Sequence, residues 1–312
     1  MWSIETIQRL PSKHFRLLAN ERHMLWVNIL GAAMAVALTL AMQRQIVWTP
    51  FAIGFAATLG LAAVGAYARE TKSSPRIALA LVGFAIYAGF TAVSMVFIFA
   101  LLPLDRPLID PTLIAIDGKL GYHWPALVSW FADHPLLARA LAIVYLSSQQ
   151  QLIFTILLLS GLSRELQLHR FLAVGIITLI IAATIWWAIP SVGPSAFSTV
   201  PEQDIIATNL HFTPAFGEVL RGLIQHGPAE INPEVITGII AFPSYHIIMA
   251  SMVVFFTRGT PAFIPLALLN SAMIPAVLVQ GGHHLVDLIG GLAVFALGVW
   301  VASRVIRDPR SA

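Results

Sequence analysis

Long apolar segments recur along this chain and constrain its fold more than any other feature. Each is close to the roughly 20 residues that a helix needs to cross a bilayer. Charged residues make up only 11% of the chain, whereas a typical soluble domain has about 25%. We therefore expect an all-α fold, a polytopic membrane bundle of about eight transmembrane helices. The apolar segments cover residues 24–43, 50–67, 77–102, 136–159, 171–189, 239–256, 262–280 and 284–304.

The basic residues between these segments indicate how the bundle is oriented. With the N-terminus in the cytoplasm, 13 of the 18 Lys and Arg residues fall in cytoplasmic segments and 5 in outer segments. Cytoplasmic loops carry an excess of Lys and Arg, so we expect both termini in the cytoplasm. Residues 1–23 are too polar for a signal peptide, and we expect a retained interfacial segment.

Composition also excludes several classes of protein. The sequence contains no cysteine, which rules out disulfides and thiolate metal sites. The formal net charge is only +3 and the basic residues are dispersed, so no nucleic-acid partner is expected.

Two long connections fall on the outer side of the predicted bundle. Residues 103–135 indicate one or two short amphipathic helices at the interface. Residues 190–241 are too many for a bare loop without function. A site at this face of the membrane is therefore expected.

Two ionisable residues stand where the last apolar segment begins. His283 and Asp287 are four residues apart, a spacing that places both side chains on one face of a helix. The carboxylate can then hold one ring nitrogen and leave the other free as a base or nucleophile. Gly281 and Gly282 precede them and let a ligand approach the anion-binding start of a helix. A histidine in this place suggests chemistry on a phosphate.

A second polar motif opens the sixth apolar segment. Ser244 and His246 follow Pro243, which suits the first turn of a helix. A serine hydroxyl and helix-start amides can bind a phosphate oxygen, and His246 can act as a general acid. By the count of segments, this motif and His283 lie at the same membrane face.

The two motifs together resemble the type-2 phosphatidic acid phosphatase superfamily. Residues 242–246, Phe-Pro-Ser-Tyr-His, match its Pro-Ser-x-His motif, and residues 282–290, Gly-His-His-Leu-Val-Asp-Leu-Ile-Gly, match its His-x-x-x-Asp motif. The chain is most similar to the inositol phosphorylceramide synthase-like branch, including bacterial members. Softer similarity extends the resemblance to about residues 100–305.

The resemblance implies a metal-independent phosphoryl transfer in two steps. His283 would be the nucleophile that forms a phosphohistidine, oriented by Asp287. His246 would protonate the leaving oxygen and then activate the acceptor, and Ser244 would bind the phosphate together with Gly282 and Tyr245.

The resemblance also implies how the chain is divided and what it acts on. Residues 104–305 would form the catalytic membrane domain, after helices in 24–103 and before a cytoplasmic tail at 306–312. The substrate would be a lipid phosphate or a phospholipid, with an alcohol or a sphingolipid as a candidate acceptor and no cofactor. A bacterial inner membrane is the expected location, with the active site on the periplasmic side.

The sequence departs from the superfamily pattern in its cations. Nothing near Pro190 provides the Lys-x6-Arg-Pro motif, and Val277 stands where an arginine precedes the nucleophile. A phosphoryl group in transfer needs such charges. Arg221 is the sole Lys or Arg in the long outer connection and the candidate replacement. Further candidate donors are His211, His226 and Gln280.

Other polar and aromatic residues carry weaker expectations. His284 lacks a carboxylate four residues on and is expected to face lipid headgroups or a loop. The polar residues at 145–151 and Asn270 could line the wall of the site or bond to neighbouring helices, and packing between helices is the preferred expectation. Trp186 and Trp187, near a span end, are expected in an aromatic belt.

Two other classes of function remain open at this stage. A metalloenzyme could use His246, His283 and Asp287 as zinc ligands, although no His-Glu-x-x-His pair is present. A transporter could use a His–Asp relay, but its ionisable groups would lie near the middle of the membrane. Sensitivity to a chelator would distinguish the first of these from phosphohistidine chemistry.

Overall fold

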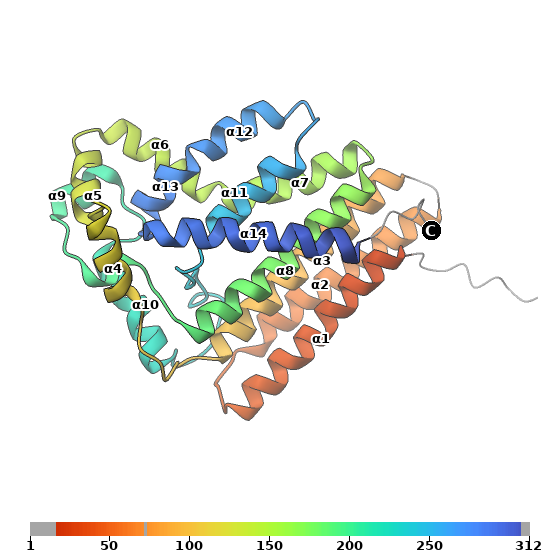
Figure 1. Cartoon of the computed structure of the whole chain (residues 1–312). Coiled ribbons are helices and arrows are strands. Elements are labelled where there is room, and N and C mark those ends of the chain that lie inside the picture. Colours follow the sequence, from red (N-terminus) through yellow and green to blue (C-terminus); the bar gives the residue numbers. More distant parts are fainter. Residues whose placement is uncertain (1–16, 72–73, 307–312) are drawn as a thin grey trace, which may run out of the picture.

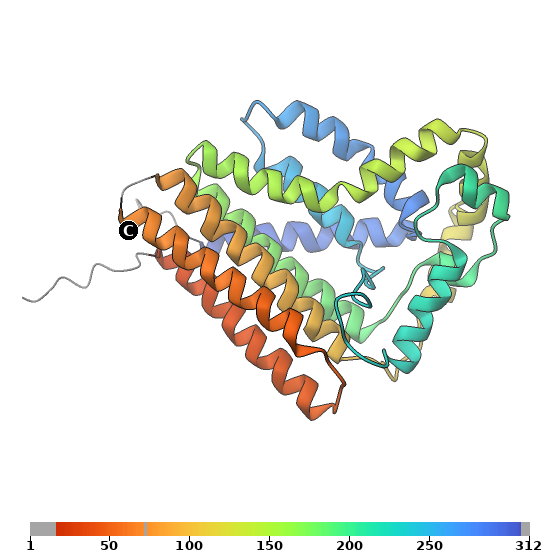
Figure 2. The ribbon, with the colours of Figure 1, turned by 180° about the vertical axis from the view of Figure 1, so that it is seen from behind.

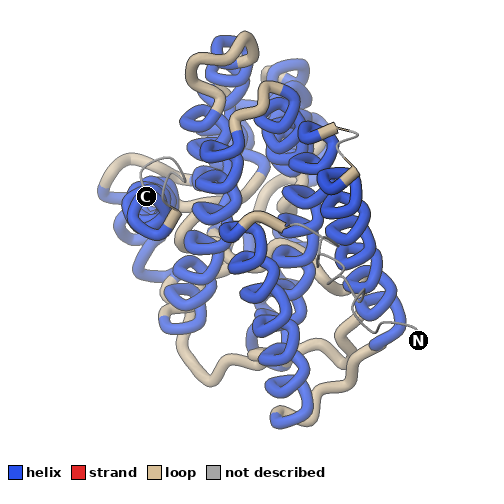
Figure 3. The backbone as a smooth tube through the Cα atoms, turned by 90° about the vertical axis from the view of Figure 1, so that its right-hand side faces the viewer, coloured by secondary structure: helices blue, strands red, loops and turns tan. Residues whose placement is uncertain are grey.

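The computed structural model describes residues 17–71 and 74–306, and in these ranges all regular structure is helical (Figures 1 and 3). The predicted all-α fold is confirmed. The elements are α1 Ala19–Ala41, α2 Trp48–Glu70, α3 Pro75–Ala100, α4 Asp110–Lys119, α5 Trp124–Ala132, α6 Pro135–Leu146, α7 Ser148–Gly161, α8 Glu165–Ala188, the 3-10 turn η1 Pro194–Phe197, α9 Glu202–Thr208, α10 Pro214–His226, α11 Tyr245–Phe256, α12 Phe263–Ser271, α13 Met273–Gln280 and α14 Leu285–Val305.

Fewer helices than expected are long enough to cross a bilayer. Within the described ranges six qualify: α1, α2, α3, α8, α14 and the stretch Phe263–Gln280 made of α12 and α13. The number rises to seven only if α5 and α6, which are bent by 119° relative to each other, count as one span. The predicted spans 136–159 and 239–256 are therefore wrong as drawn. The first is divided between α6 and α7, and the second is shortened to the 12 residues of α11.

The first three helices form a layer along one side of the bundle (Figure 2). α3 packs against both α1 and α2. A buried ion pair joins α1 to α2, since both Nη atoms of Arg69 bond the carboxylate of Glu21, at 2.6 and 2.7 Å. Bidentate pairs of this kind are strong.

The two ends of the bundle differ in character. Nε of Arg170, near the start of α8, donates to the carbonyl of Ile306 after α14, at 3.3 Å. Nε2 of His169 lies 3.5 Å from Glu21 at the start of α1. At the other end the short helices α4, α5, α9 and α10 cover the start of α14 (Figure 1). The predicted connections 103–135 and 190–241 therefore contain short helices, and they enclose the region of His283.

Close contact between α8 and α14 sets the position of the last helix. A Cβ atom added at Gly298 would lie 2.4 Å from Cγ2 of Thr178, so only glycine fits. Small residues at such positions let membrane helices approach and pack.

We predict that Gly298→Leu lowers the melting temperature of the detergent-solubilised protein by several degrees, because overpacking forces α8 and α14 apart. The matched control is Gly60→Leu in α2, where an added Cβ meets nothing within 4 Å. That control should melt at or above the parent temperature, because leucine favours helix more than glycine does. Equal melting temperatures for Gly298→Leu and the parent would contradict the assignment.

Candidate functional site

The predicted nucleophile stands in the turn that leads into α14. Gly282 has a φ of +54°, a left-handed conformation that glycine adopts readily. His283 follows outside the helix, His284 is the N-cap, and Leu285 is the first helical residue. The expectation that His283 and Asp287 share one face of a helix is therefore wrong, since Asp287 alone lies within it.

The carboxylate of Asp287 nevertheless holds His283. Its Oδ2 atom accepts hydrogen bonds from Nδ1 of His283 at 3.0 Å and from the backbone N–H of His284 at 2.9 Å. Asp287 thus caps the helix and orients the imidazole at once. Because Nδ1 carries the proton that it donates to the carboxylate, Nε2 keeps a free lone pair. His283 is only 3% exposed and Asp287 is fully buried, so water does not compete for this bond.

The second predicted motif meets the first at the start of α11. The backbone N–H of Ser244, the N-cap of α11, donates to the carbonyl of Asp287 at 3.0 Å. The ring of His246 lies edge to face with the ring of His283, with the ring centroids 6.2 Å apart. Tyr145 stacks on His246 with centroids 4.2 Å apart. The fold therefore brings both predicted catalytic histidines to one place.

Both histidines line a cavity of about 260 Å³. A third histidine, His211, lines it too, together with the phenol rings of Tyr145 and Tyr245. Among the described residues that line this cavity, none is Lys, Arg, Asp or Glu. Apolar side chains make up much of its wall, including Ile98, Leu179, Phe212, Leu220, Ile239 and Met249. The cavity can therefore hold a largely apolar molecule with one reactive group beside the imidazoles.

The residues predicted to bind phosphate lie in different surroundings. Ser244 is fully buried, and its Oγ atom has no hydrogen-bond partner among the described residues. Tyr245 lines the cavity, and its hydroxyl donates to the carbonyl of Gly175 at 3.2 Å. Gly282 lies against Ser195, whose buried Oγ also lacks a partner in the described chain. Unpaired buried hydroxyls are costly, but neither serine is among the described residues that line the cavity.

Arg221 lies apart from these residues. Its guanidinium pairs with Glu218 on α10 and lies 5.6 Å from the ring centroid of Phe197. The neighbouring Leu220 lines the cavity, and Arg221 does not. A role for Arg221 in holding phosphate stays a prediction.

The polar residues of the predicted fourth span have two different roles. Tyr145 and Ser148 line the cavity. Gln151 instead accepts a hydrogen bond from Nδ2 of Asn270 at 2.6 Å, inside the bundle. The expectation of packing between helices thus holds for Gln151 and Asn270, whereas Tyr145 belongs to the site.

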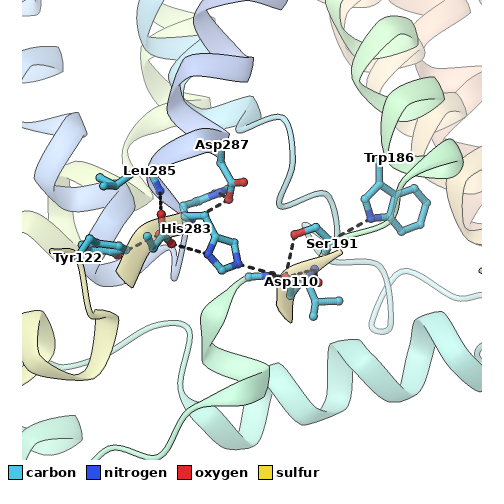
Figure 4. A network of polar contacts seen from close by, with 11 residues as sticks. Asp110, Tyr122, Trp186, Ser191, His283, Leu285 and Asp287 are labelled. Atoms are coloured by element: carbon cyan, nitrogen blue, oxygen red, sulfur yellow. Dashed lines mark hydrogen bonds and ion pairs between the residues drawn. The ribbon is translucent and has the colours of Figure 1, made fainter. Parts of the chain in front are cut away.

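His284 lies between two carboxylates in a second buried network, and Figure 4 shows the part of that network around Asp110. Its Nδ1 lies 2.7 Å from Oδ2 of Asp117, and its Nε2 lies 3.3 Å from Oδ1 of Asp110. All three side chains are at most 3% exposed. The expectation that His284 faces headgroups or a loop is therefore wrong, because two carboxylates from α4 pair with it. With an acceptor at each ring nitrogen, both nitrogens donate and the ring is an imidazolium.

Burial by itself would lower the pKa of His284. The hydrogen bonds to Asp110 and Asp117 and the charges of Asp287 and Asp110 outweigh that effect, and the pKa is raised above its usual value of 6.5.

The Asp110 carboxylate also organises the turn after α8. It accepts hydrogen bonds from Oγ of Ser191 at 2.8 Å and from the backbone N–H groups of Val192 and Gly193, the latter at 2.7 Å (Figure 4). Gly193 has a φ of +92°, and a Cβ atom there would lie 2.2 Å from the carbonyl oxygen of Gly282. The network therefore holds the turn at residues 191–193 in close contact with the backbone of Gly282, next to His283.

The two tryptophans at the end of α8 differ. Nε1 of Trp186 donates to the carbonyl of Ser191 at 3.2 Å, and the ring is fully buried. The prediction that Trp186 belongs to an aromatic belt is therefore wrong. Trp187 is 40% exposed, and its ring lies 3.9 Å from the guanidinium carbon of Arg106.

Tyr122, from the connection 103–135, contacts the backbone of His283. Its hydroxyl donates to the carbonyl oxygen of His283 at 3.0 Å. Burial, with the charges of Asp117 and Asp287, raises the pKa of this phenol. The hydroxyl therefore stays protonated and remains a donor.

Sequence reasoning did not assign roles to Asp110, Asp117 or Tyr122. One signal was available, because Asp110 and Asp117 are seven residues apart and so share one face of a short helix. Two carboxylates on the buried face of α4 require a buried cation. The His283–His284 doublet offers one, but only the fold shows which histidine takes it.

In the part of the chain that is described, no three His, Cys, Asp or Glu side chains are arranged to hold a metal ion. The carboxylate of Asp287 is instead engaged with His283 and the N-cap. The geometry therefore favours a His–Asp pair over a set of zinc ligands.

We predict that the stabilising effect of the Asp117 carboxylate depends on pH. A raised pKa of His284 contributes stability that is full below pH 6.5 and declines as pH rises through the folded-state pKa. The difference in melting temperature between the parent and Asp117→Asn should therefore be largest in acid and shrink above pH 6.5. Thermal melts of both proteins in detergent at a series of pH values measure it. A difference that grows with pH would contradict the imidazolium assignment.

Comparison with known proteins bears on the family of the chain. A family model described as the PAP2 superfamily matches residues 111–301, more than half of the chain. No curated protein and no solved structure gives a match. The matched range holds His246, His283 and Asp287 and does not resolve the narrower branch predicted from the sequence. The chain therefore belongs to the PAP2 superfamily, which generally comprises membrane-type phosphatases and phosphotransferases.

Proposed function

We propose that this protein is a membrane phosphatase or phosphotransferase that cleaves a lipid phosphate through a phosphohistidine at His283. One observation carries the proposal. The Asp287-held imidazole of His283 and the imidazole of His246 line the same apolar cavity, with ring centroids 6.2 Å apart.

In the first step the lone pair on Nε2 of His283 attacks phosphorus. A nitrogen–phosphorus bond forms, and the bond from phosphorus to the lipid oxygen breaks. Protonated His246 gives its proton to that oxygen, so the leaving group departs as a neutral alcohol. Asp287 stabilises the positive charge that develops on the His283 ring.

In the second step His246 acts in reverse. It takes a proton from water or from an alcohol, and the oxygen of that acceptor attacks phosphorus. The nitrogen–phosphorus bond breaks, and its electron pair returns to Nε2 of His283. His246 gives up a proton in the first step and takes one back in the second, so the enzyme returns to its starting state.

Hydrogen-bond donors near the imidazoles suit the phosphate oxygens. The unpartnered hydroxyl of Ser244, which directly precedes the lining residue Tyr245, is the first candidate. The backbone of Gly282 and the phenol of Tyr245 are the others, and the phenol would have to exchange its bond to Gly175 for one to the phosphate. Hydrogen bonds to a charged oxygen are stronger than those between neutral groups.

An apolar groove beside the cavity supports a lipid as substrate. It has a volume of about 590 Å³ and lies between α1, α3 and α8. Ile98 and Leu179 line both the groove and the catalytic cavity. A lipid could therefore place its chain in the groove and its phosphate among the histidines.

The charge of the cavity bears on the kind of phosphate. With no Lys or Arg among the described residues of its lining, a phosphodiester with one negative charge is easier to accommodate than a dianion. This agrees with the inositol phosphorylceramide synthase-like branch. We therefore favour a phospholipid donor, with water, an alcohol or a sphingolipid as acceptor.

We place the site on the extracytoplasmic face of a bacterial inner membrane, with both termini in the cytoplasm. The distribution of 13 against 5 basic residues supports this orientation. The geometry is compatible with it, because the start of α14, just after His283, lies at the end of the bundle opposite the start of α1 (Figure 1).

We predict that His283→Ala abolishes release of product from phosphatidic acid and from phosphatidylinositol in detergent micelles. A brief reaction with ³²P-labelled lipid should leave an acid-labile, base-stable label on the parent protein and none on the variant. Activity of the parent should persist in excess chelator. An unlabelled but active parent, or activity lost on chelation, would instead support a metal-activated water.

We predict that Asp287→Asn keeps the fold but lowers kcat by about 10²–10⁴-fold, because the amide no longer fixes the Nδ1–H tautomer of His283. Steady-state kinetics, with circular dichroism as the control for folding, measure this. A folded variant with unchanged kcat would remove Asp287 from the mechanism.

A further inference from the structure

We propose that His211 forms an anion-binding subsite at the rim of the cavity, where its imidazolium pairs with a phosphate oxygen of the substrate. This inference rests on the proposed function and names the cation that the site uses. It makes His211 a binding residue, separate from the reacting pair His283 and His246.

The position of His211 suits a rim residue. It lines the same cavity as His246 and His283 but is exposed, whereas His283 is buried. Its ring centroid lies 5.7 Å from that of Tyr145, which in turn stacks on His246 at 4.2 Å. The ring thus meets both the solvent and the interior of the site.

The backbone around His211 is held by a buried side chain. Oε1 of Gln280 accepts from the N–H of His211 at 2.9 Å, and Nε2 of Gln280 donates to the carbonyl of Thr208 at 3.0 Å. The carbonyl of Gln280 accepts from the N–H of Phe212 at 3.1 Å. Gln280 is fully buried and precedes Gly281 directly. These bonds therefore hold the loop with His211 against the segment that carries His283. Gln280, which the sequence analysis offered as a further donor, instead positions His211, another of those candidate donors.

The charge available to the site points to the same residue. The described lining of the cavity holds three histidines and no Lys or Arg. His283 must be neutral at Nε2 to attack, and His246 must give up its proton. His211 is the histidine left to stay protonated beside the phosphate through both steps once the substrate is bound.

The side chain is free to take this role. The titratable groups that face it are Tyr145 from α6 and His246 from α11, and no carboxylate of the described chain forms an ion pair with it. Partial burial lowers the pKa of His211, so the ring is neutral near pH 7 until an anion binds. Anion binding and proton uptake are then linked, and substrate affinity should weaken as pH rises.

The test uses the full-length protein in detergent, with three variants of His211. His211→Ala removes the ring, His211→Arg supplies a permanent cation, and His211→Gln keeps a donor without charge. His134→Ala is the matched control, because this exposed histidine lies at the same end of the bundle, bonded to the carbonyl of Trp130. Arg221→Ala is included because the sequence made Arg221 the candidate for this charge.

Two measurements are made on every variant. Calorimetry gives the dissociation constant of inorganic phosphate at pH 6 and pH 8, and steady-state kinetics with phosphatidic acid give kcat and KM at the same pH values. We expect His211→Ala and His211→Gln to weaken phosphate binding and raise KM about tenfold at pH 6 with little change in kcat. His211→Arg should restore both and remove their pH dependence, and His134→Ala should match the parent.

The outcomes separate the two proposals. An active parent with His211→Ala equal to it in KM and phosphate binding would overturn the His211 subsite, as would a loss that follows Arg221→Ala instead. A loss of kcat alone would also overturn it, since a binding residue acts on KM. A parent that turns over no lipid phosphate would overturn the proposed function, while calorimetry would still decide whether His211 binds phosphate.

Discussion

The site depends on one buried carboxylate. Oδ2 of Asp287 accepts from Nδ1 of His283 and from the N–H of His284, so a single oxygen both caps the start of α14 and orients the ring of His283. The backbone carbonyl of the same residue accepts from Ser244 and thereby brings α11, with His246, to the start of α14. Catalytic orientation and helix capping are thus the same interaction, which explains why the site can be rigid although His283 lies outside any helix.

A second layer of charge holds this first one in place. Asp110 and Asp117 enclose His284, and Asp110 also binds the turn at Ser191 and Gly193. A carboxylate buried alone would be costly, and pairing with a buried cation compensates for that cost. Adjacent histidines therefore differ in their partners: Nδ1 of His283 pairs with one carboxylate, whereas both ring nitrogens of His284 pair with carboxylates. The distinction arises from the acceptors around each ring.

The cavity offers little fixed positive charge to a phosphate. In the proposed mechanism the imidazoles supply the charge when a proton is present, and the unpaired hydroxyl of Ser244 is a candidate donor. In an apolar site each such contact is stronger than in water, and permanent cations would be expensive to bury. An apolar groove shares Ile98 and Leu179 with the cavity, and it suits an apolar lipid chain in the same way. Weakly charged surroundings and an apolar substrate are consistent with each other.

The sequence by itself determined the all-α membrane class, the two motifs and their convergence at one end of the bundle, because hydropathy and residue spacing are local properties. It also led to the superfamily through His246, His283 and Asp287. It did not determine the partners of His284, the break of the predicted fourth span, or the surroundings of Arg221. Those depend on contacts between residues far apart in the chain, such as Asp117 with His284 and Glu21 with Arg69. Only the tertiary structure decides that the carboxylates of Asp110 and Asp117 meet His284, because the direction of each side chain in the packed turn determines its partners.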